Sequence, residues 1–383
     1  MFFCCSEIRN LLILAIVLYF ILKTKHLHNL TIYKCYINIC KKAIKLYDYK
    51  DKLRNSPYYS ICIAVYNMEQ YIEIALLSVL NQSFRDFEII IINDYSLDNS
   101  EKIIKQLQFN NSQIKLINHK NNLGVYESRV DAIKNAKGNY IIFLDPDDLL
   151  SNQNLLKDLY QYNLIYNEDI IEFIVMVNEE RNNRLYYPWS HRMNHFHDFN
   201  EKIINHPYLS DILFFENNKY SDVFCRCIWN KMVRKEVLYK TINFIGYEKK
   251  HFNLAEDTII NILNFQFANN YSNLNIIGYM YNIREESMSH SNKGKEVDIK
   301  MSYNILHFYK LFYKYVKHFN KDFNYLYFDL KAFDYYLDYI KKYNCSYSNK
   351  KPIIKFYKKI YREKNISREF RQYAKSFLYE FDN

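Results

Sequence analysis

The sequence places three carboxylates of Asp145–Asp148 (DPDD) directly after the apolar run Tyr140–Leu144. Hard divalent cations such as Mg²⁺ or Mn²⁺ bind carboxylate oxygens together with substrate phosphates. Crowded carboxylates repel one another unless a cation joins them, and Pro146 fixes the turn without adding a donor. Asp145, Asp147 and Asp148 are therefore candidates for a cation site. The alternative is an acidic turn that caps the next helix through Asp147 or Ser151.

Two further polar groups are candidates for ligand binding. Asn93–Ser96 (NDYS) follows the apolar run FEIIII, and the carboxylate of Asp94 is suited to accept a hydrogen bond from an N–H group of a bound base. A plain Asx turn is the alternative. Arg129 follows Asn122–Gly124, and its guanidinium is suited to pair with a phosphate, whereas a solvated arginine on a helix is equally compatible with the sequence.

Glu256 and Asp257 open a predicted helix (EDTIINILNF). Acidic residues are common there because the helix dipole favours negative charge, and a general base near an acceptor hydroxyl is the functional alternative. Three histidines, in WSHRMNHFH, are assigned to a surface loop, because no carboxylate or thiol with ligand spacing accompanies them; they are His191, His195 and His197.

Strand-like and helical patterns alternate through the first half of the chain. Short apolar runs predict strands, and 3.6-residue periodicity predicts helices. This alternation predicts an α/β fold with a mainly parallel sheet and helices on both faces. In such sheets, ligands bind beyond the carboxyl ends of the strands, where the polar groups above lie. The predicted strands are 59–65, 87–92, 113–118 and 140–144; the helices are 69–80, 98–109 and 126–137, the last with Gly138 as its C′ residue.

The later part of the chain has a weaker pattern. It predicts helices over 228–240 and 255–268 and a strand over 275–282, with a surface insertion at 179–225. Beyond residue 295, apolar residues recur among lysines at helical spacing. We expect a helical C-terminal extension over 296–383.

The composition of the 383 residues limits the class of protein. Apolar residues make up 49%, which excludes wholesale disorder. The chain has 52 basic and 42 acidic residues, a net charge of +10. The basic residues are spread along the chain rather than clustered, so nucleic acid is not an expected partner. No Walker loop or G-x-S-x-G elbow is present, which argues against P-loop enzymes and α/β-hydrolases.

The amino terminus contains an apolar segment, Leu11–Leu22. A short membrane anchor over 1–25, a cleaved signal peptide and a buried helix all fit this pattern, and we favour the single-pass anchor because no small-residue cleavage pattern follows. Lys23, Lys25 and Lys34 follow the segment and only Arg9 precedes it, which favours a cytosolic location for the remainder of the chain. Residues 26–56 would then form a juxtamembrane stalk.

Several blocks, in the same order, resemble glycosyltransferase family 2, whose members have the GT-A fold. They are SICIAVYNMEQYIEIALLSVLNQSFRDFEIIIINDYSLDNS, NNLGVYESRVDAIKNAKGNYIIFLDPDD, CIWNKMVRKEVL, AEDTIINIL and YNIREESMS. The match runs over roughly residues 58–290, so the expected catalytic domain is 57–295.

The resemblance implies a nucleotide-diphospho-sugar donor, a divalent metal (Mn²⁺ or Mg²⁺), inversion at the anomeric carbon, and a glycan, lipid or protein acceptor. Asp147 and Asp148 would lie nearest the metal, Asp257 would act as the base, and Glu256 would position it. Lys231 and Arg284 would help to steady phosphate charge. A catalytically silent homologue that binds a glycan or nucleotide is the alternative. The residues implied for nucleotide-sugar binding are Val65, Tyr66, Asn67, Asp94, Ser96, Arg129 and Asp145.

The sequence departs from the family pattern near the expected base-binding loop. Ala64 stands where proline is usual, Asn93 replaces the first of two aspartates, Tyr95 stands where glycine is common, and Leu97 replaces threonine. A tyrosine does not easily adopt the positive φ of a glycine, so we expect this loop to differ from the family.

Overall fold

The computed structural model describes residues 56–179, 184–186, 204–205, 227–246 and 256–283, together with six single positions nearer the C-terminus. The predicted anchor, most of the stalk, the three-histidine segment and nearly all of the C-terminal extension lie outside these residues. Within the described part, no helix combines the length and the apolar character that a membrane crossing needs.

The chain divides into two compact units, residues 1–57 with 157–167 and residues 58–156 with 168–383. In the first unit the structure describes mainly the end of α6 (Leu155–Tyr166), where the rings of Tyr162 and Tyr166 stack at 4.4 Å. Every candidate site residue belongs to the second unit, which carries the sheet.

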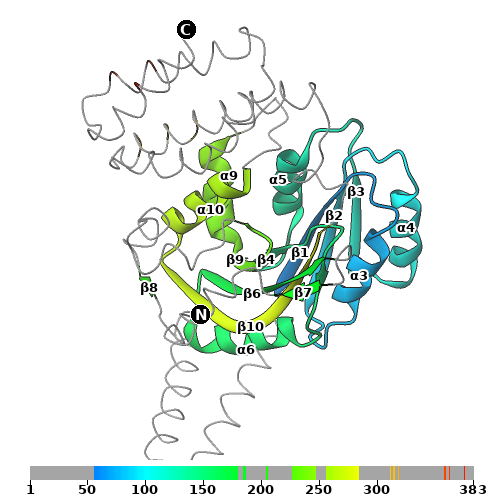
Figure 1. Ribbon diagram of the computed structural model, residues 1–383, viewed down its shortest axis with the longest axis horizontal. Coiled ribbons are helices and arrows are strands. Elements are labelled where there is room, and N and C mark those ends of the chain that lie inside the picture. Colours follow the sequence, from blue (N-terminus) through cyan, green and yellow to red (C-terminus); the bar gives the residue numbers. More distant parts are fainter. Residues whose placement is uncertain are drawn as a thin grey trace, which may run out of the picture. The chain divides into compact units, whose positions relative to one another are not determined.

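Four parallel strands form one half of the sheet, in the order β3-β2-β1-β4 (Figure 1). The isoleucines of the inner strands β1, β2 and β4 are buried, as expected of strands covered on both faces, whereas Leu116 and Ile117 of the edge strand β3 are half-buried. Val65 pairs with Asn93, and Asn93 with Asn118, so the carboxyl ends of β1, β2 and β3 lie side by side. The predicted parallel sheet is confirmed, with the strands β1 Tyr59–Val65, β2 Phe87–Asn93, β3 Ile114–Asn118 and β4 Tyr140–Phe143.

The other half of the sheet is mixed and continues as β4-β9-β6-β10-β5. β9 is antiparallel to both of its neighbours, whereas β6 and β10 are parallel. The predicted helix over 228–240 is therefore wrong in its first part, because Met232 and Val233 are buried between β4 and β6 as a strand. The strands are β5 Leu149–Leu150, β6 Ile170–Glu179, β7 Arg184–Tyr186, β8 Ile204–Asn205, β9 Lys231–Arg234 and β10 Asn270–Ile283.

Helices lie on both faces of the parallel half (Figure 1). The right-handed crossovers after β1 and β2 place α3 and α4 on one face, and the return from β3 to β4 places α5 on the other. α5 packs against β1 and β2 and against α9, which in turn packs against α10. The helices are α3 Ile72–Leu80, α4 Ser100–Asn110, α5 Val125–Asn135, α9 Lys235–Ile245 and α10 Glu256–Phe267.

Gly138 has a different role from the helix-ending one that we expect from the sequence. α5 ends at Asn135 with Ala136 as its C-cap, and Gly138 is not among the described residues with positive φ. Its backbone instead approaches β1, where an added Cβ would lie 2.5 Å from the nitrogen of Ser60. Glycine is required here because the chain leading into β4 passes directly against the start of β1.

Candidate active site

The polar residues singled out in the sequence gather at the carboxyl edge of the parallel strands. Tyr66 and Asn67 follow β1, Asp94 follows β2, and Asp145–Asp148 follow β4. Because β1 pairs in parallel with both β2 and β4, these three segments leave the sheet at the same edge. The carboxyl edge of a parallel sheet is where α/β proteins of this architecture bind ligands.

Arg129 joins carboxylates from three segments of the chain. It lies on the buried face of α5 and is 5% exposed. Nη1 donates to Glu256 at 2.8 Å and to the neighbouring Asp257, and Nη2 donates to Asp145 at 3.1 Å. The planar guanidinium suits such a multiple contact. The arginine therefore links the end of β4 to the start of α10.

The surroundings of Arg129 exclude the solvated-arginine interpretation. Burial disfavours its charge, but the carboxylates of Asp257, Asp145 and Glu256 outweigh that effect and raise the pKa of Arg129. Its described hydrogen bonds go to carboxylates rather than toward an open anion site. Its assignment to nucleotide-sugar binding stays a prediction, and the structure adds a second role in holding the two helix-start carboxylates.

Glu256 and Asp257 differ in their access to solvent. The Glu256 side chain is 10% exposed and that of Asp257 is 24% exposed. Burial raises the pKa of Asp257, and the positive charge of Arg129 opposes this rise. A carboxylate with a raised pKa that still reaches solvent is suited to take a proton from a substrate. Of the two, Asp257 has the greater access to solvent, and its role as the base stays a prediction.

We expect Glu256 to give folding a specific pH dependence. Burial, followed by the charge of Asp257, raises its pKa from 4.5 to about 7. The folded chain then keeps this proton to a higher pH than the unfolded chain, so its contribution to stability falls as pH rises from about 4.5 to about 7. In Glu256→Gln the side chain cannot ionise. The difference in Tm, variant minus wild type, should therefore increase across this window.

Thermal unfolding between pH 4.5 and 8 checks this expectation. The control is Glu236→Gln, which removes an exposed acidic side chain from the first turn of α9. A Tm difference for Glu256→Gln that is flat, or that parallels the control, would contradict the expectation.

The end of β10 holds the Asp145–Asp148 turn by four hydrogen bonds. The Tyr279 hydroxyl accepts from the Asp145 N–H at 3.1 Å and donates to Oδ2 of Asp148 at 2.8 Å. The Asn282 N–H donates to Oδ1 of Asp148, and its side-chain amide donates to the Asp147 carbonyl, both at 2.8 Å. Trp229 stacks on the Tyr279 ring with centroids 4.5 Å apart.

Sequence reasoning missed Tyr279 and Asn282 as functional residues. The only signal was their place on a predicted strand, because the partner of each lies more than 130 positions earlier in the chain. Their bonds leave Asp148 buried at 2% exposure, whereas Asp145 and Asp147 are partly exposed. Asp148 is therefore the anchored member of the turn.

The turn is compatible with a divalent cation. Burial, followed by the charges of Asp147 and Asp145, raises the pKa of Asp148 well above its usual range. This is the crowding that a cation would relieve. No three His, Cys, Asp or Glu side chains within the described ranges converge on one ion position. Mg²⁺ is commonly held by one or two carboxylates together with substrate phosphates, and this turn supplies carboxylates.

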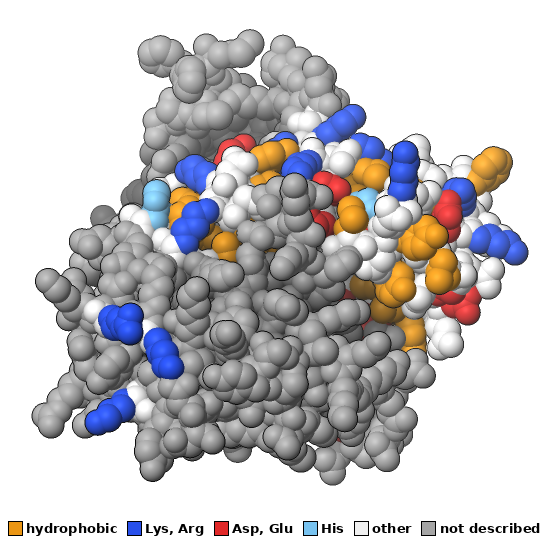
Figure 2. All heavy atoms as spheres, turned by 90° about the horizontal axis from the view of Figure 1, so that it is seen from above, with side chains coloured by type: hydrophobic (Ala, Val, Ile, Leu, Met, Phe, Trp, Pro, Cys, Tyr) orange, Lys and Arg blue, Asp and Glu red, His pale blue; other side chains and the backbone are white. Residues whose placement is uncertain are grey.

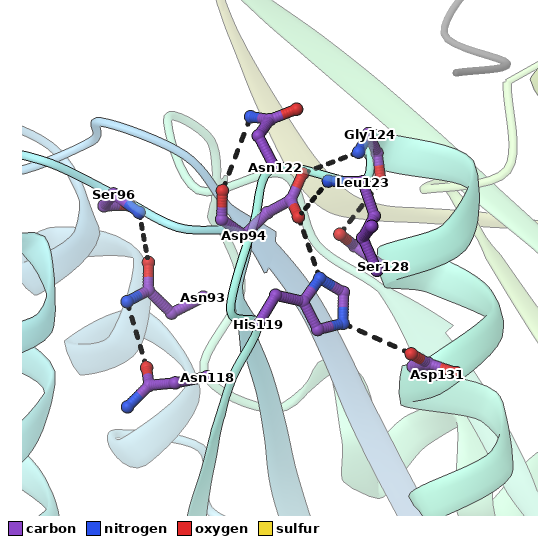
Figure 3. Close-up of polar contacts among 10 residues, drawn as sticks. All are labelled: Asn93, Asp94, Ser96, Asn118, His119, Asn122, Leu123, Gly124, Ser128 and Asp131. Atoms are coloured by element: carbon purple, nitrogen blue, oxygen red, sulfur yellow. Dashed lines mark hydrogen bonds and ion pairs between the residues drawn. The ribbon is translucent and has the colours of Figure 1, made fainter. Parts of the chain in front are cut away.

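Asp94 holds the turn before α5 (Figure 3). Its carboxylate accepts from the backbone N–H groups of Leu123 and Gly124 and lies against Nδ1 of His119, each at 2.8 Å. His119 continues to Asp131 through Nε2 at 3.2 Å. Gly124 has φ 95°, which a side chain would disfavour. Asp94 is 3% exposed, so its predicted contact with a base stays a prediction, while its observed role is to position this turn.

The loops after β1 and β2 are bonded to each other. The Asn67 N–H donates to Oγ of Ser96 at 3.0 Å, and the Leu97 N–H donates to Oδ1 of Asn67 at 2.8 Å. The Ser96 N–H donates to Oδ1 of Asn93, which in turn donates to Asn118 (Figure 3). Asn93, where the family has aspartate, thus ties β2 to β3 and to its own loop.

Lys231 is fully buried on β9, yet its positive charge acts on Asp257. It donates to the Cys227 carbonyl at 2.7 Å and lies 3.3 Å from Glu172. The expectation that it steadies phosphate charge stays a prediction. Arg284 lies outside the described residues.

The fold and site together define an α/β protein with clustered carboxylates at the carboxyl edge of its sheet, which is where proteins of this architecture bind ligands. Acidic side chains are visible among basic and apolar ones on the described part of the face in Figure 2. Residues 60–242 match the family model described as Glycosyl transferase family 2. Over this stretch the chain is similar to members of that family, and the fold is of the GT-A type.

Curated relatives of the chain are also named as glycosyltransferases. The chain is 28% identical over 236 residues to the Uncharacterized glycosyltransferase EpsJ of Bacillus subtilis, covering 61% of this chain and 63% of that protein. It is 27% identical over 235 residues to the Glycosyltransferase GlyA of Streptococcus pneumoniae, covering 60% and 31%. The chain thus spans less than two thirds of the length of these relatives.

A solved structure supports the fold. The chain is similar to Staphylococcus aureus TarS 1–349 in complex with UDP-GlcNAc, with a TM-score of 0.63 and 19% identity over 84% of this chain and 88% of that one. At this identity the similarity establishes the fold alone. The predicted α/β, GT-A-type architecture is confirmed.

Proposed function

We propose that this protein is a glycosyltransferase that transfers a sugar from a nucleotide-diphosphate donor to a hydroxyl group of a glycan, lipid or protein. The observation that carries the proposal is the contact of Arg129 with Asp145, Glu256 and Asp257. It brings the carboxylate turn after β4 and the helix-start carboxylates to one place at the ligand-binding edge. The names of the family and of the relatives support the same activity.

We propose a single displacement with inversion. The acceptor oxygen attacks the anomeric carbon as the bond to the diphosphate breaks, and Asp257 accepts the hydroxyl proton. Arg129 holds Asp257 and Glu256 in place for this step. Asp147 and Asp148 would hold a divalent cation, with Asp148 anchored in the turn by Tyr279 and Asn282. When bound, such a cation supplies positive charge for the departing diphosphate.

A screen of nucleotide sugars tests the proposal. The full chain is incubated with UDP-, GDP- and ADP-sugars, each with and without Mn²⁺, and the Tm and the release of free sugar are measured. A metal-dependent rise in Tm together with sugar release supports a transferase. A rise in Tm without release under any condition indicates a silent nucleotide-binding homologue. If no nucleotide sugar has either effect, the proposal fails.

Tyr279→Phe is expected to weaken metal-dependent donor binding while leaving the fold intact. It removes one hydroxyl that bonds both Asp145 and Asp148, yet keeps the ring that stacks on Trp229. Loss of one such hydrogen bond to a carboxylate costs about 1.5–3 kcal/mol, so calorimetry with UDP and Mn²⁺ should show roughly 10- to 100-fold weaker binding.

The matched control is Tyr239→Phe, which removes a hydroxyl that bonds the Lys134 carbonyl. Unchanged Mn²⁺-dependent affinity in Tyr279→Phe would contradict the role assigned to β10. Membrane attachment through residues 1–25 and a cytosolic catalytic domain stay predictions.

A further inference from the structure

Tyr95 combines a costly backbone conformation with an exposed aromatic side chain. Its φ is 65°, in the left-handed region that residues with a Cβ rarely adopt. The sequence predicts that a tyrosine here changes the loop, but the structure keeps the positive φ of the glycine that the family favours. Such conformations persist where surrounding contacts over-determine them, and they cluster at ligand-binding sites.

The contacts that hold this conformation come from both sides of Tyr95. The Asp94 N–H donates to the Val65 carbonyl at 2.8 Å, and the Asp94 carboxylate is bonded to the turn before α5. On the other side, Ser96 bonds Asn93 and Asn67. The backbone at Tyr95 is thus fixed by its neighbours, and its own ring contributes none of these bonds.

Tyr95 follows β2 at the carboxyl edge of the parallel strands, which is where the proposed function places the donor nucleotide. Tyr95 is 48% exposed and Tyr66 is 44% exposed, and they follow the adjacent parallel strands β2 and β1. Aromatic rings are costly to leave in water, and their faces stack on nucleobases. Leu97, in the same loop, is 76% exposed and adds apolar surface. Two aromatic side chains and a leucine therefore flank Asp94 at the ligand-binding edge.

We propose that Tyr95 contacts the base of the donor nucleotide and helps to determine which base is accepted. The inference rests on the proposed function, because it assigns a base contact within the same donor site. The ring would supply stacking surface that a glycine cannot, whereas the left-handed backbone at Tyr95 destabilises the fold. Replacing Tyr95 by glycine should therefore stabilise the fold and weaken binding of the nucleotide.

Tyr95→Gly tests the proposal through two measurements on the full chain. Glycine relieves the left-handed strain, so we expect the Tm to rise by about 1–3 °C. Loss of a stacking partner should weaken binding of the preferred diphosphate, among UDP, GDP and ADP with Mn²⁺, by at least about fivefold. The differences in affinity between UDP, GDP and ADP should also become smaller. Tyr95→Phe keeps the ring and should bind within about twofold of wild type.

Two further variants make the outcome decisive. Tyr95→Asn, another residue tolerated at positive φ, should reproduce the loss of affinity if Tyr95→Gly does not fold. Phe109→Ala removes a ring that is 90% exposed on α4 and should leave affinity unchanged. If wild type binds a diphosphate but Tyr95→Gly keeps its affinity and base preference, the inference is overturned and the proposed function stands. A lower Tm together with weaker binding in Tyr95→Gly also overturns the inference. If wild type binds none of the three, both proposals fail.

Discussion

Asp257→Asn is expected to lower turnover by about 10²-fold or more at saturating donor, with donor affinity nearly unchanged. Asp257 is the more exposed of the two helix-start carboxylates, at 24%, and burial raises its pKa. The amide cannot accept the acceptor's proton, yet it has nearly the same size and can still accept a hydrogen bond from Arg129. The chemical step should therefore suffer while binding does not.

Steady-state kinetics on the donor found by the screen, together with calorimetry on its nucleotide diphosphate, checks this expectation. The control is Glu236→Gln, which removes a carboxylate from the start of α9 instead of α10. Near-normal turnover in Asp257→Asn would remove it as the base. A loss of donor affinity as large as the loss of turnover would assign it to binding.

Arg129→Met is expected to cause the largest loss of stability among the variants considered, about 3–5 kcal/mol in the free energy of unfolding. The substitution keeps much of the side-chain volume but leaves Asp145, Glu256 and Asp257 without the cation that joins them. Uncompensated buried charge is among the most destabilising changes a point mutation can make. Arg129→Lys should recover only part of the loss, because an ammonium cannot reproduce the planar fork.

Urea unfolding measures this effect, and Arg234→Met provides the comparison. Arg234 contacts one carboxylate, Asp169, at 2.6 Å, and its side chain is 24% exposed, so its removal should be clearly less destabilising. If Arg129→Met lowers the free energy of unfolding by no more than Arg234→Met does, the contact of Arg129 with three carboxylates does not stabilise the fold.

The parallel half of the sheet could be predicted because its signals are local. The four isoleucines of FEIIII are apolar on both faces, as a doubly covered strand must be, and the observed β2 begins at the predicted Phe87. β9 could not be predicted in this way. Lys231–Arg234 is only four residues long and runs directly into α9, so its helical surroundings mask it. Its strand conformation comes from pairing with β4 and β6, which are distant in the chain.

The candidate site likewise has a part with local sequence signals and a part that depends on contacts between distant segments. Asp94, Asp145–Asp148 and Asp257 are recognisable from the types and spacing of nearby residues, and the structure brings the carboxylate turn and Asp257 into contact with one arginine. That contact spans 128 positions, and no local pattern contains it. Tyr279 and Asn282 on β10 could not be recognised from the sequence for the same reason. Their role comes from hydrogen bonds to Asp148, which lies more than 130 positions earlier in the chain.

The dependence of the carboxylate turn on β10 sets a lower limit for any working fragment of this protein. The stretch that matches the family ends at residue 242, before the two α10 carboxylates and before β10. A polypeptide cut there would retain the aspartates after β4 while losing every partner from α10 and β10 that orients them. Recombinant or chimeric versions must therefore extend through Ile283 at least, and an exchange of segments between relatives should carry β10 along with the first four strands.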